Sequence, residues 1–223
     1  MAKQKVSTEI QAYIRSLSSL CRNDSLAYYF TLYNFGKLQE GFLGKKRLRK
    51  ELSKLGIVDY TSFKYRLNWL KDDGWRSDYQ KMSSFLATLS ETDRKKYIES
   101  FSKEHEDYPR LFIVHYYMNK VPVEGIIAFD YAWHIYLCRA GWVLGYLSNE
   151  EAWKLMLDAA HRLQTVYSSW NEFVTAFVCG SQFREADTSF SFVKKNANLI
   201  NKLFASSTSP MVQIDWNLDL LQK

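Results

Sequence analysis

The most apolar stretch of the chain, residues 125–147, reads GIIAFDYAWHIYLCRAGWVLGYL. Its length comes close to that of a bilayer-spanning helix. It contains Asp130, His134 and Arg139, however, and ionised side chains cost several kcal/mol at bilayer depth. We therefore predict a helix buried in a protein core, running over about residues 123–146 and opened by Pro122 near its first turn.

Helical patterns surround this segment along almost the whole chain. Helices are expected over residues 8–20, from Asp24 through Phe35, and over 61–72, 75–89, 90–102, 148–166, 169–180 and 190–204. Residues 110–119 fit either a short helix or a strand. Ser148 and Glu151 form a capping box at one helix start, and Gly74 suits a left-handed position after a helix end. The tail around Trp216 is expected to dock back on the body.

Length and composition favour one globular domain. The 223 residues are 47% apolar, and nine Gly and three Pro are few for the turns of a many-stranded barrel or sandwich. We predict an all-α fold, in which a single helical domain over residues 48–223 surrounds the long buried central helix. Residues 1–47 are predicted to be an N-terminal helical extension.

The cysteines and the N-terminus predict a cytoplasmic protein without a membrane partner. Cys21, Cys138 and Cys179 are odd in number and far apart, which fits buried thiols in a reducing compartment. The apolar residues that follow the polar N-terminus are spaced helically, whereas a secretory signal needs a continuous apolar run.

Two ionisable residues of the central helix raise the question of catalysis. Asp130 and His134 are four residues apart and share one helix face, an arrangement that can hold a metal ion or orient a general base. This leaves a metal-dependent or acid/base hydrolase open as an alternative. No second acid/His pair at ligand spacing lies nearby, so we predict no catalytic residue, metal or cofactor. Asp130 and Arg139 are instead expected to satisfy each other or helix termini, forming a polar core with Glu151 and Trp170.

Positive charge is concentrated in the first half of the chain. The only charge run is Lys45 to Lys50, and aromatic residues such as Tyr60 and Tyr65 interleave with the cations that follow it. The candidate contacts to a partner or to nucleic acid are Lys45, Lys46, Arg47, Arg49, Lys50, Lys64 and Arg66. RNA or DNA binding through residues 45–66 is a second alternative, and a solvated basic helix face is the plainer interpretation.

Several blocks of sequence carry a resemblance to a known family. They are Leu55-Gly56-Ile57, Asp73-Gly74-Trp75-Arg76, Ala128-Phe129-Asp130-Tyr131-Ala132, Cys138-Arg139-Ala140-Gly141-Trp142, Ser169-Trp170-Asn171-Glu172-Phe173 and the tail from Ser209-Pro210 to Trp216. Over about residues 48–218 the chain resembles the bacterial domain-of-unknown-function family 1266. The resemblance implies a bacterial, mostly helical, cytosolic protein, and it carries no reaction with it.

Three residues depart from the pattern of that family. Trp75 stands where His is usual, Trp133 where Arg is frequent, and Ser181 where Arg is usual. If those polar residues form a site in relatives, this chain has lost much of it, which argues against a shared catalytic mechanism.

We therefore expect a non-catalytic protein-binding module. Its partner is expected to be another protein, specifically a bacterial toxin domain that this chain neutralises as an immunity or antitoxin protein. The absence of a coherent catalytic set and the many aromatic residues available as interface anchors motivate this hypothesis.

Overall fold

A computed structural model describes residues 6–21 and 42–221, and these residues form helices without any strand. The helices are α1 (Thr8–Ser19), α4 (Phe42–Ser53), α5 (Tyr60–Asp72), α6 (Arg76–Ala87), α7 (Glu91–Glu99), α8 (Tyr108–Tyr117), α9 (Ile127–Leu144), α10 (Asn149–Val166), α11 (Trp170–Glu185), α12 (Phe190–Ala205) and α13 (Pro210–Gln213). The all-α prediction is confirmed, and residues 110–117 of the ambiguous segment 110–119 fall in helix α8. The helix expected from Asp24 lies outside the described residues.

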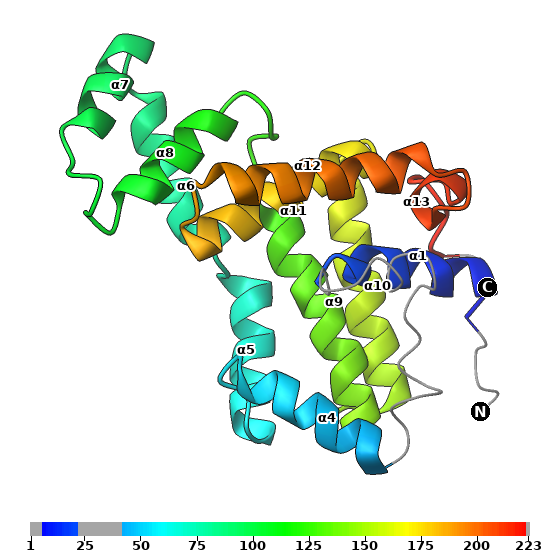
Figure 1. The fold of residues 1–223 in the computed structure, drawn as a ribbon. Helices are drawn as coiled ribbons and strands as arrows, with labels where there is room; N and C mark the ends of the chain where they lie inside the picture. Colours follow the sequence, from blue (N-terminus) through cyan, green and yellow to red (C-terminus); the bar gives the residue numbers. More distant parts are fainter. Residues whose placement is uncertain (1–5, 22–41, 222–223) are drawn as a thin grey trace.

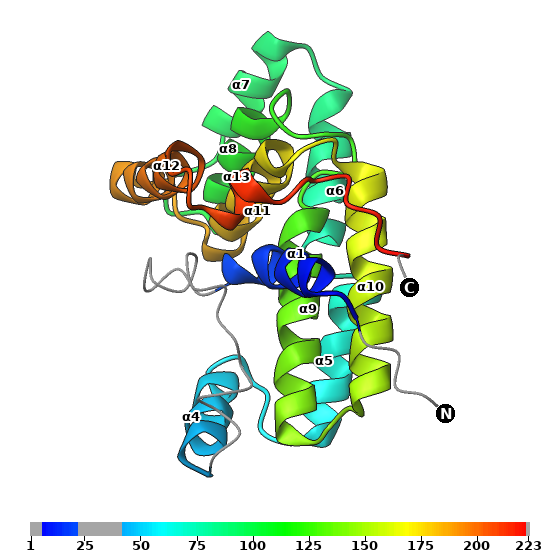
Figure 2. The ribbon, with the colours of Figure 1, turned by 90° about the vertical axis from the view of Figure 1, so that its right-hand side faces the viewer.

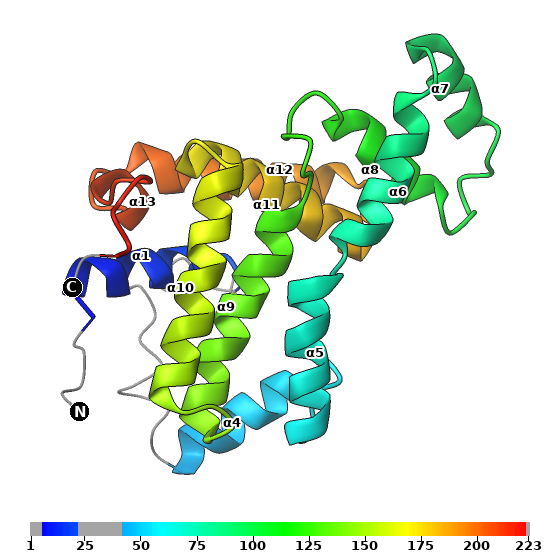
Figure 3. The ribbon, with the colours of Figure 1, turned by 180° about the vertical axis from the view of Figure 1, so that it is seen from behind.

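Helix α9 is the buried centre of the fold, as predicted. It packs against α10, α11, α5 and α1, and α10 and α5 flank it on two sides (Figure 1, Figure 3). Two glycines allow neighbouring helices to approach α9 closely. Phe63 of α5 lies against Gly141 of α9, and Phe129 of α9 lies against Gly180 of α11, so a side chain at either glycine would collide with the phenylalanine. A helix that is apolar on nearly every side is stable only when neighbours cover all of it.

The helix α9 is shorter at its start than the sequence predicts. It begins at Ile127 rather than near residue 123, so Pro122 lies before the helix and does not open it. The reason is a turn at Gly125, whose φ of +62° is left-handed. The Tyr167 hydroxyl fixes this turn, since it donates to the Gly125 carbonyl and accepts from the Ala128 N–H, both at 3.0 Å.

Helix α1 belongs to the same core as α9. It crosses α9 and α10 on one side (Figure 2), and its residues Tyr13, Ile14 and Leu17 are buried. The Tyr13 hydroxyl donates to the Trp216 carbonyl at 3.0 Å. The Trp216 indole in turn donates to the Tyr167 carbonyl at 2.7 Å, so the tail docks back on the body as predicted.

Helices α6, α7 and α8 form an arm with a smaller core of its own (Figure 1). Leu86, Ile98, Leu111 and Val114 are buried there, and the arm joins the main body through α11 and the α5–α6 turn. Ser90 caps α7 by accepting from the Asp93 N–H at 3.2 Å, in agreement with the sequence pattern.

Candidate functional site

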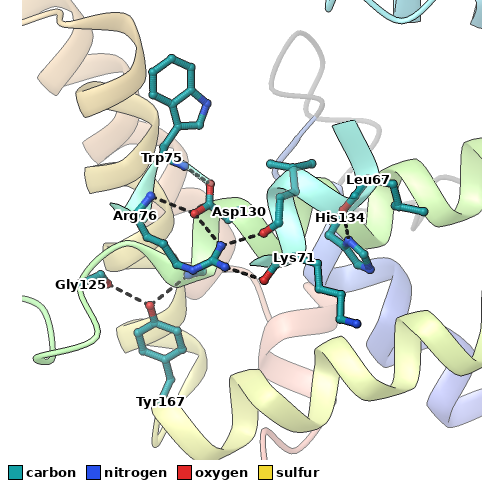
Figure 4. Close-up of polar contacts among 10 residues, drawn as sticks. Leu67, Lys71, Trp75, Arg76, Gly125, Asp130, His134 and Tyr167 are labelled. Atoms are coloured by element: carbon teal, nitrogen blue, oxygen red, sulfur yellow. Dashed lines mark hydrogen bonds and ion pairs between the residues drawn. The ribbon is translucent and has the colours of Figure 1, made fainter. Parts of the chain in front are cut away.

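Asp130 lies in the first turn of α9, and its carboxylate is completely buried. Its Oδ1 accepts from the Trp75 N–H and its Oδ2 from the Arg76 N–H, both at 3.0 Å, at the start of α6 (Figure 4). The Arg76 guanidinium also donates to Oδ2 at 3.1 Å. The carboxylate therefore caps α6, where free N–H groups and the helix dipole both favour a negative charge.

Arg76 links this carboxylate to the end of α5. Its Nη1 donates to the Leu70 carbonyl at 2.7 Å and its Nη2 to the Lys71 carbonyl at 2.5 Å (Figure 4). Gly74, with a φ of +65°, makes the turn between the two helices, and its N–H donates to the Trp69 carbonyl at 2.7 Å. Asp130 thus ties the α5–α6 turn to the central helix. Burial raises the pKa of Asp130 to about 6, against the lowering effect of the bonds from Arg76 and Trp75.

His134 has a separate partner one turn further along α9. Its Nδ1 lies 3.1 Å from the Leu67 carbonyl of α5, inside the core (Figure 4). Burial lowers the pKa of His134 to about 4, so the ring is neutral at neutral pH. In the described ranges, no group of three or more His, Cys, Asp or Glu side chains is placed to hold a metal ion. Each member of the Asp130/His134 pair is bonded to a backbone segment of another helix.

The buried neutral His134 makes stability depend on pH, and a His134→Asn variant isolates this dependence. The unfolded chain takes up a proton below pH 6.5, whereas the folded chain resists protonation down to about pH 4. Wild type should therefore lose unfolding free energy relative to the variant as pH falls from 6.5 to 4, by on the order of 3 kcal/mol. Chemical denaturation of both proteins at several pH values measures the difference. Asp130 titrates in both proteins, so its opposite contribution cancels.

Of the remaining predicted core residues, Trp170 is buried as expected, whereas Arg139 and Glu151 differ from the prediction. Arg139 does not bond to Asp130; its Nη1 donates to the Ser18 hydroxyl of α1 at 2.7 Å. The two residues are nine positions apart on one helix, a separation of roughly 13 Å, which explains why they do not pair. Glu151 is at the surface rather than in the core, where its carboxylate accepts from the Ser148 N–H at 2.8 Å in the predicted capping box. Trp170 is buried, and its indole donates to the Ile214 carbonyl at 2.8 Å.

The basic segment, residues 45–66, covers most of α4 and the first half of α5. It carries eight Lys or Arg and two acidic residues, whereas the rest of the chain carries 22 of each, so this segment holds the whole net charge of +6. Lys46, Arg49, Lys50 and Lys64 are exposed, and Arg47 forms an exposed ion pair with Glu51 at 3.3 Å. Tyr60 and Tyr65 are also exposed, at 51% and 70%. Lys45 is partly exposed, and Arg66 donates to the Leu55 carbonyl at 3.3 Å.

Two adjoining pockets lie beside the same part of α9. One, of about 340 Å³, is lined by residues of α5, α9 and α11 together with the α4–α5 and α5–α6 connections. The other, of about 530 Å³, lies between the end of α1, α9 and the end of α11. Phe129, Trp133 and Arg184 line both. Trp75 lines the first and Ser181 the second, so all three residues that depart from the family pattern face these pockets.

Sequence reasoning missed the partners of Asp130 and the tyrosine that fixes the start of α9. Arg76 is 54 residues away from Asp130 along the chain, and Tyr167 is 39 away from Ala128. Neither contact has a local sequence signature, because both depend on how the helices pack. The sequence also does not predict that the tryptophans of the smaller pocket lie together, because Trp69, Trp75 and Trp133 come from separate elements.

Comparison with known proteins identifies a family. A family model described as "Protein of unknown function (DUF1266)" matches residues 52–216 of the 223 in the chain. No curated protein and no solved structure is similar enough to count as a match. Within residues 6–21 and 42–221, no helix combines the length and the apolar composition needed to cross a bilayer.

Proposed function

The chain belongs to the DUF1266 family of proteins of unknown function, and from its structure we propose that it is a non-catalytic protein-binding module. Its partner in this proposal is a bacterial toxin domain, which the chain binds and neutralises in the cytoplasm as an immunity or antitoxin protein. The observation that carries the proposal is the uneven distribution of charge, because one segment holds the whole positive excess of the chain.

The interior supports binding over catalysis. A general base needs a free carboxylate or imidazole that a substrate can reach. Asp130 is fully buried under three donors, and His134 is buried against a backbone carbonyl. The hydrolase alternative would have to use these two groups, which already hold α5 and α6 against α9. We therefore prefer a function carried by the outer surface.

The basic segment is the surface that we assign to the partner. Its cations Lys46, Arg49 and Lys50 are exposed and have no ion-pair partner among the described residues. Complementary charge steers protein association and suppresses wrong partners. Exposed Tyr60 and Tyr65 supply aromatic anchors beside the cations. The segment thus suits an acidic face of a toxin domain.

Free cysteines are consistent with the proposed cytoplasmic location. Cys21, Cys138 and Cys179 form no disulfide. Burial raises the pKa of the Cys138 and Cys179 thiols well above the ordinary value, which keeps them protonated and unreactive.

Charge reversal on the basic segment tests the proposal. The proposal requires a gene for a toxin domain beside the gene of this protein, and that toxin domain is the probe, titrated by calorimetry with the full chain. We expect Lys46→Glu with Arg49→Glu to weaken binding by at least about 100-fold, because two favourable charge contacts become repulsive. The unfolding free energy should not change, since both side chains are exposed.

The matched control reverses two exposed cations of α10, Lys154→Glu with Arg162→Glu. It changes the net charge by the same amount and should leave the affinity within about threefold of wild type. Equal loss in both double variants, or no binding of the toxin domain by wild type, would contradict the proposal.

A second candidate function, RNA or DNA binding, is favoured by the same combination of exposed cations and tyrosines. It predicts that a 20-nucleotide single-stranded RNA binds with an affinity that falls steeply between about 50 and 200 mM salt. If RNA binds in this way and the toxin domain does not, the basic segment contacts phosphates.

A further inference from the structure

The smaller pocket combines aromatic walls with positive charge, and we infer that it binds a small aromatic anion, a planar ring that bears a carboxylate or phosphate group. We call it the tryptophan pocket and define it by Trp69, Trp75, Trp133, Lys54, Arg66 and Arg184. The inference does not rest on the proposed protein partner, because it concerns a concave site rather than the exposed cations of α4.

The walls of the tryptophan pocket favour a planar ring. Trp69 and Trp75 meet edge to face, with ring centroids 5.7 Å apart and an interplanar angle of 87°, and all three tryptophans are half-buried. The cavity of about 340 Å³ is at the lower end of the range typical of small-molecule sites. Partly exposed indoles that line a cavity of this size offer aromatic contact surface to a planar ligand.

The cations of the pocket are held in place by its aromatic walls. The Arg66 guanidinium lies over the Trp69 ring at 5.0 Å, and the Arg184 guanidinium lies over the Trp133 ring at 5.8 Å. Arg66 uses one donor on the Leu55 carbonyl, and Arg184 contacts Glu185 at 3.5 Å, which leaves each guanidinium with further donors. Among the described residues that line this pocket, none is acidic. Its charge therefore selects an anion, and guanidinium groups match carboxylate and phosphate oxygens.

Trp133 also carries an unpaired donor beside the pocket. The Nε1–H of Trp133 is buried and has no hydrogen-bond partner within the described part of the chain. A buried donor without an acceptor is unfavourable by about 1–3 kcal/mol. Because this atom has no accessible surface, a ligand oxygen can accept from it only after the indole turns toward the pocket, and a purely apolar ligand would leave it unpaired.

Nuclear magnetic resonance of the tryptophan indole N–H groups tests the inference. The probe is 2-naphthoate, compared with neutral 2-naphthol and with acetate, which has the charge but no ring. We expect 2-naphthoate to shift the Trp133 Nε1–H signal, which the Trp133→Phe variant identifies by its absence. 2-Naphthol and acetate should each bind at least about tenfold more weakly, since each lacks one half of the recognised chemistry.

Variants distinguish specific binding in the pocket from attraction of the anion to the overall positive charge of the protein. Arg66→Gln and Arg184→Gln should each weaken 2-naphthoate binding about tenfold, the effect of losing one charge-assisted hydrogen bond. Lys71→Gln removes an exposed cation of the same helix α5 that does not line the pocket, and this variant should bind 2-naphthoate like wild type. Unchanged thermal unfolding shows that each variant is folded.

Three results would overturn the inference. The first is an unmoved Trp133 signal at millimolar 2-naphthoate, and the second is equal affinity for 2-naphthol. The third is equal loss of affinity in the Lys71→Gln control and the two arginine variants, which would mean that the anion senses only the overall charge.

Discussion

Replacing Asp130 by Ala is expected to lower the unfolding free energy by about 3–5 kcal/mol, the cost of breaking a buried charge pair from one side. The substitution leaves the Trp75 and Arg76 N–H groups without their acceptor and the Arg76 guanidinium without its counter-charge. The turn between α5 and α6 then loses its link to α9. Urea denaturation monitored by circular dichroism measures the change.

The Asp78→Ala variant is the matched control for this prediction. Asp78 is on α6 too and pairs with Lys81 at 3.1 Å, but both side chains are more than half exposed. Exposed ion pairs contribute about 1 kcal/mol or less, so the control should unfold almost like wild type. Similar stability of the Asp130→Ala and Asp78→Ala proteins would refute the role assigned to the buried carboxylate.

Replacing Gly74 by Ala is expected to lower the unfolding free energy by a comparable amount, about 4 kcal/mol or more. The left-handed backbone at Gly74 strains any other residue by roughly 1–2 kcal/mol. A Cβ atom there would also overlap the Asp130 carboxylate, whose position is fixed by three hydrogen bonds. The carboxylate has to move, so the buried bonds that it accepts are lost as well.

Gly56→Ala separates the two causes. Gly56 is also left-handed, with a φ of +75°, but a Cβ atom there meets nothing within 4 Å. We expect the unfolding free energy of this variant to fall only by the cost of the backbone strain, about 1–2 kcal/mol. The difference between the two alanine variants, measured by the same denaturation experiment, reports the contact with Asp130. Equal destabilisation would show that the carboxylate is not held where the structure places it.

Local sequence patterns are sufficient to predict most helices of this protein. The capping residues Ser90 and Ser148 and the left-handed Gly74 mark helix ends that the structure confirms. The apolar run around Asp130 predicts the buried helix α9, because charged residues within it exclude a lipid environment. These features depend on residues within one or two turns of each other, so they can be read without knowing the fold.

The candidate sites depend on contacts that no local pattern encodes. That Asp130 needs a partner follows from the cost of burying a lone charge, which leaves Arg139 and the helix termini as alternatives. That the partner is the start of α6 depends on where the chain places Trp75 and Arg76 against α9. Arg139 reaches Ser18, a residue 121 positions away. The basic segment is visible as a charge run, whereas the tryptophan pocket exists only where Trp69, Trp75 and Trp133 converge.

We propose that the buried polar residues stabilise the fold and that the basic surface binds the partner. One titration tests both statements together. The affinity for the neighbouring toxin domain is measured for Asp130→Asn and for Lys46→Glu with Arg49→Glu, at a low temperature where both are folded. We predict that Asp130→Asn binds within about threefold of wild type although it is less stable, and that the charge-reversed protein loses at least about 100-fold. Lost binding in folded Asp130→Asn, with wild-type affinity in the charge-reversed protein, would place the function inside the molecule and contradict this account.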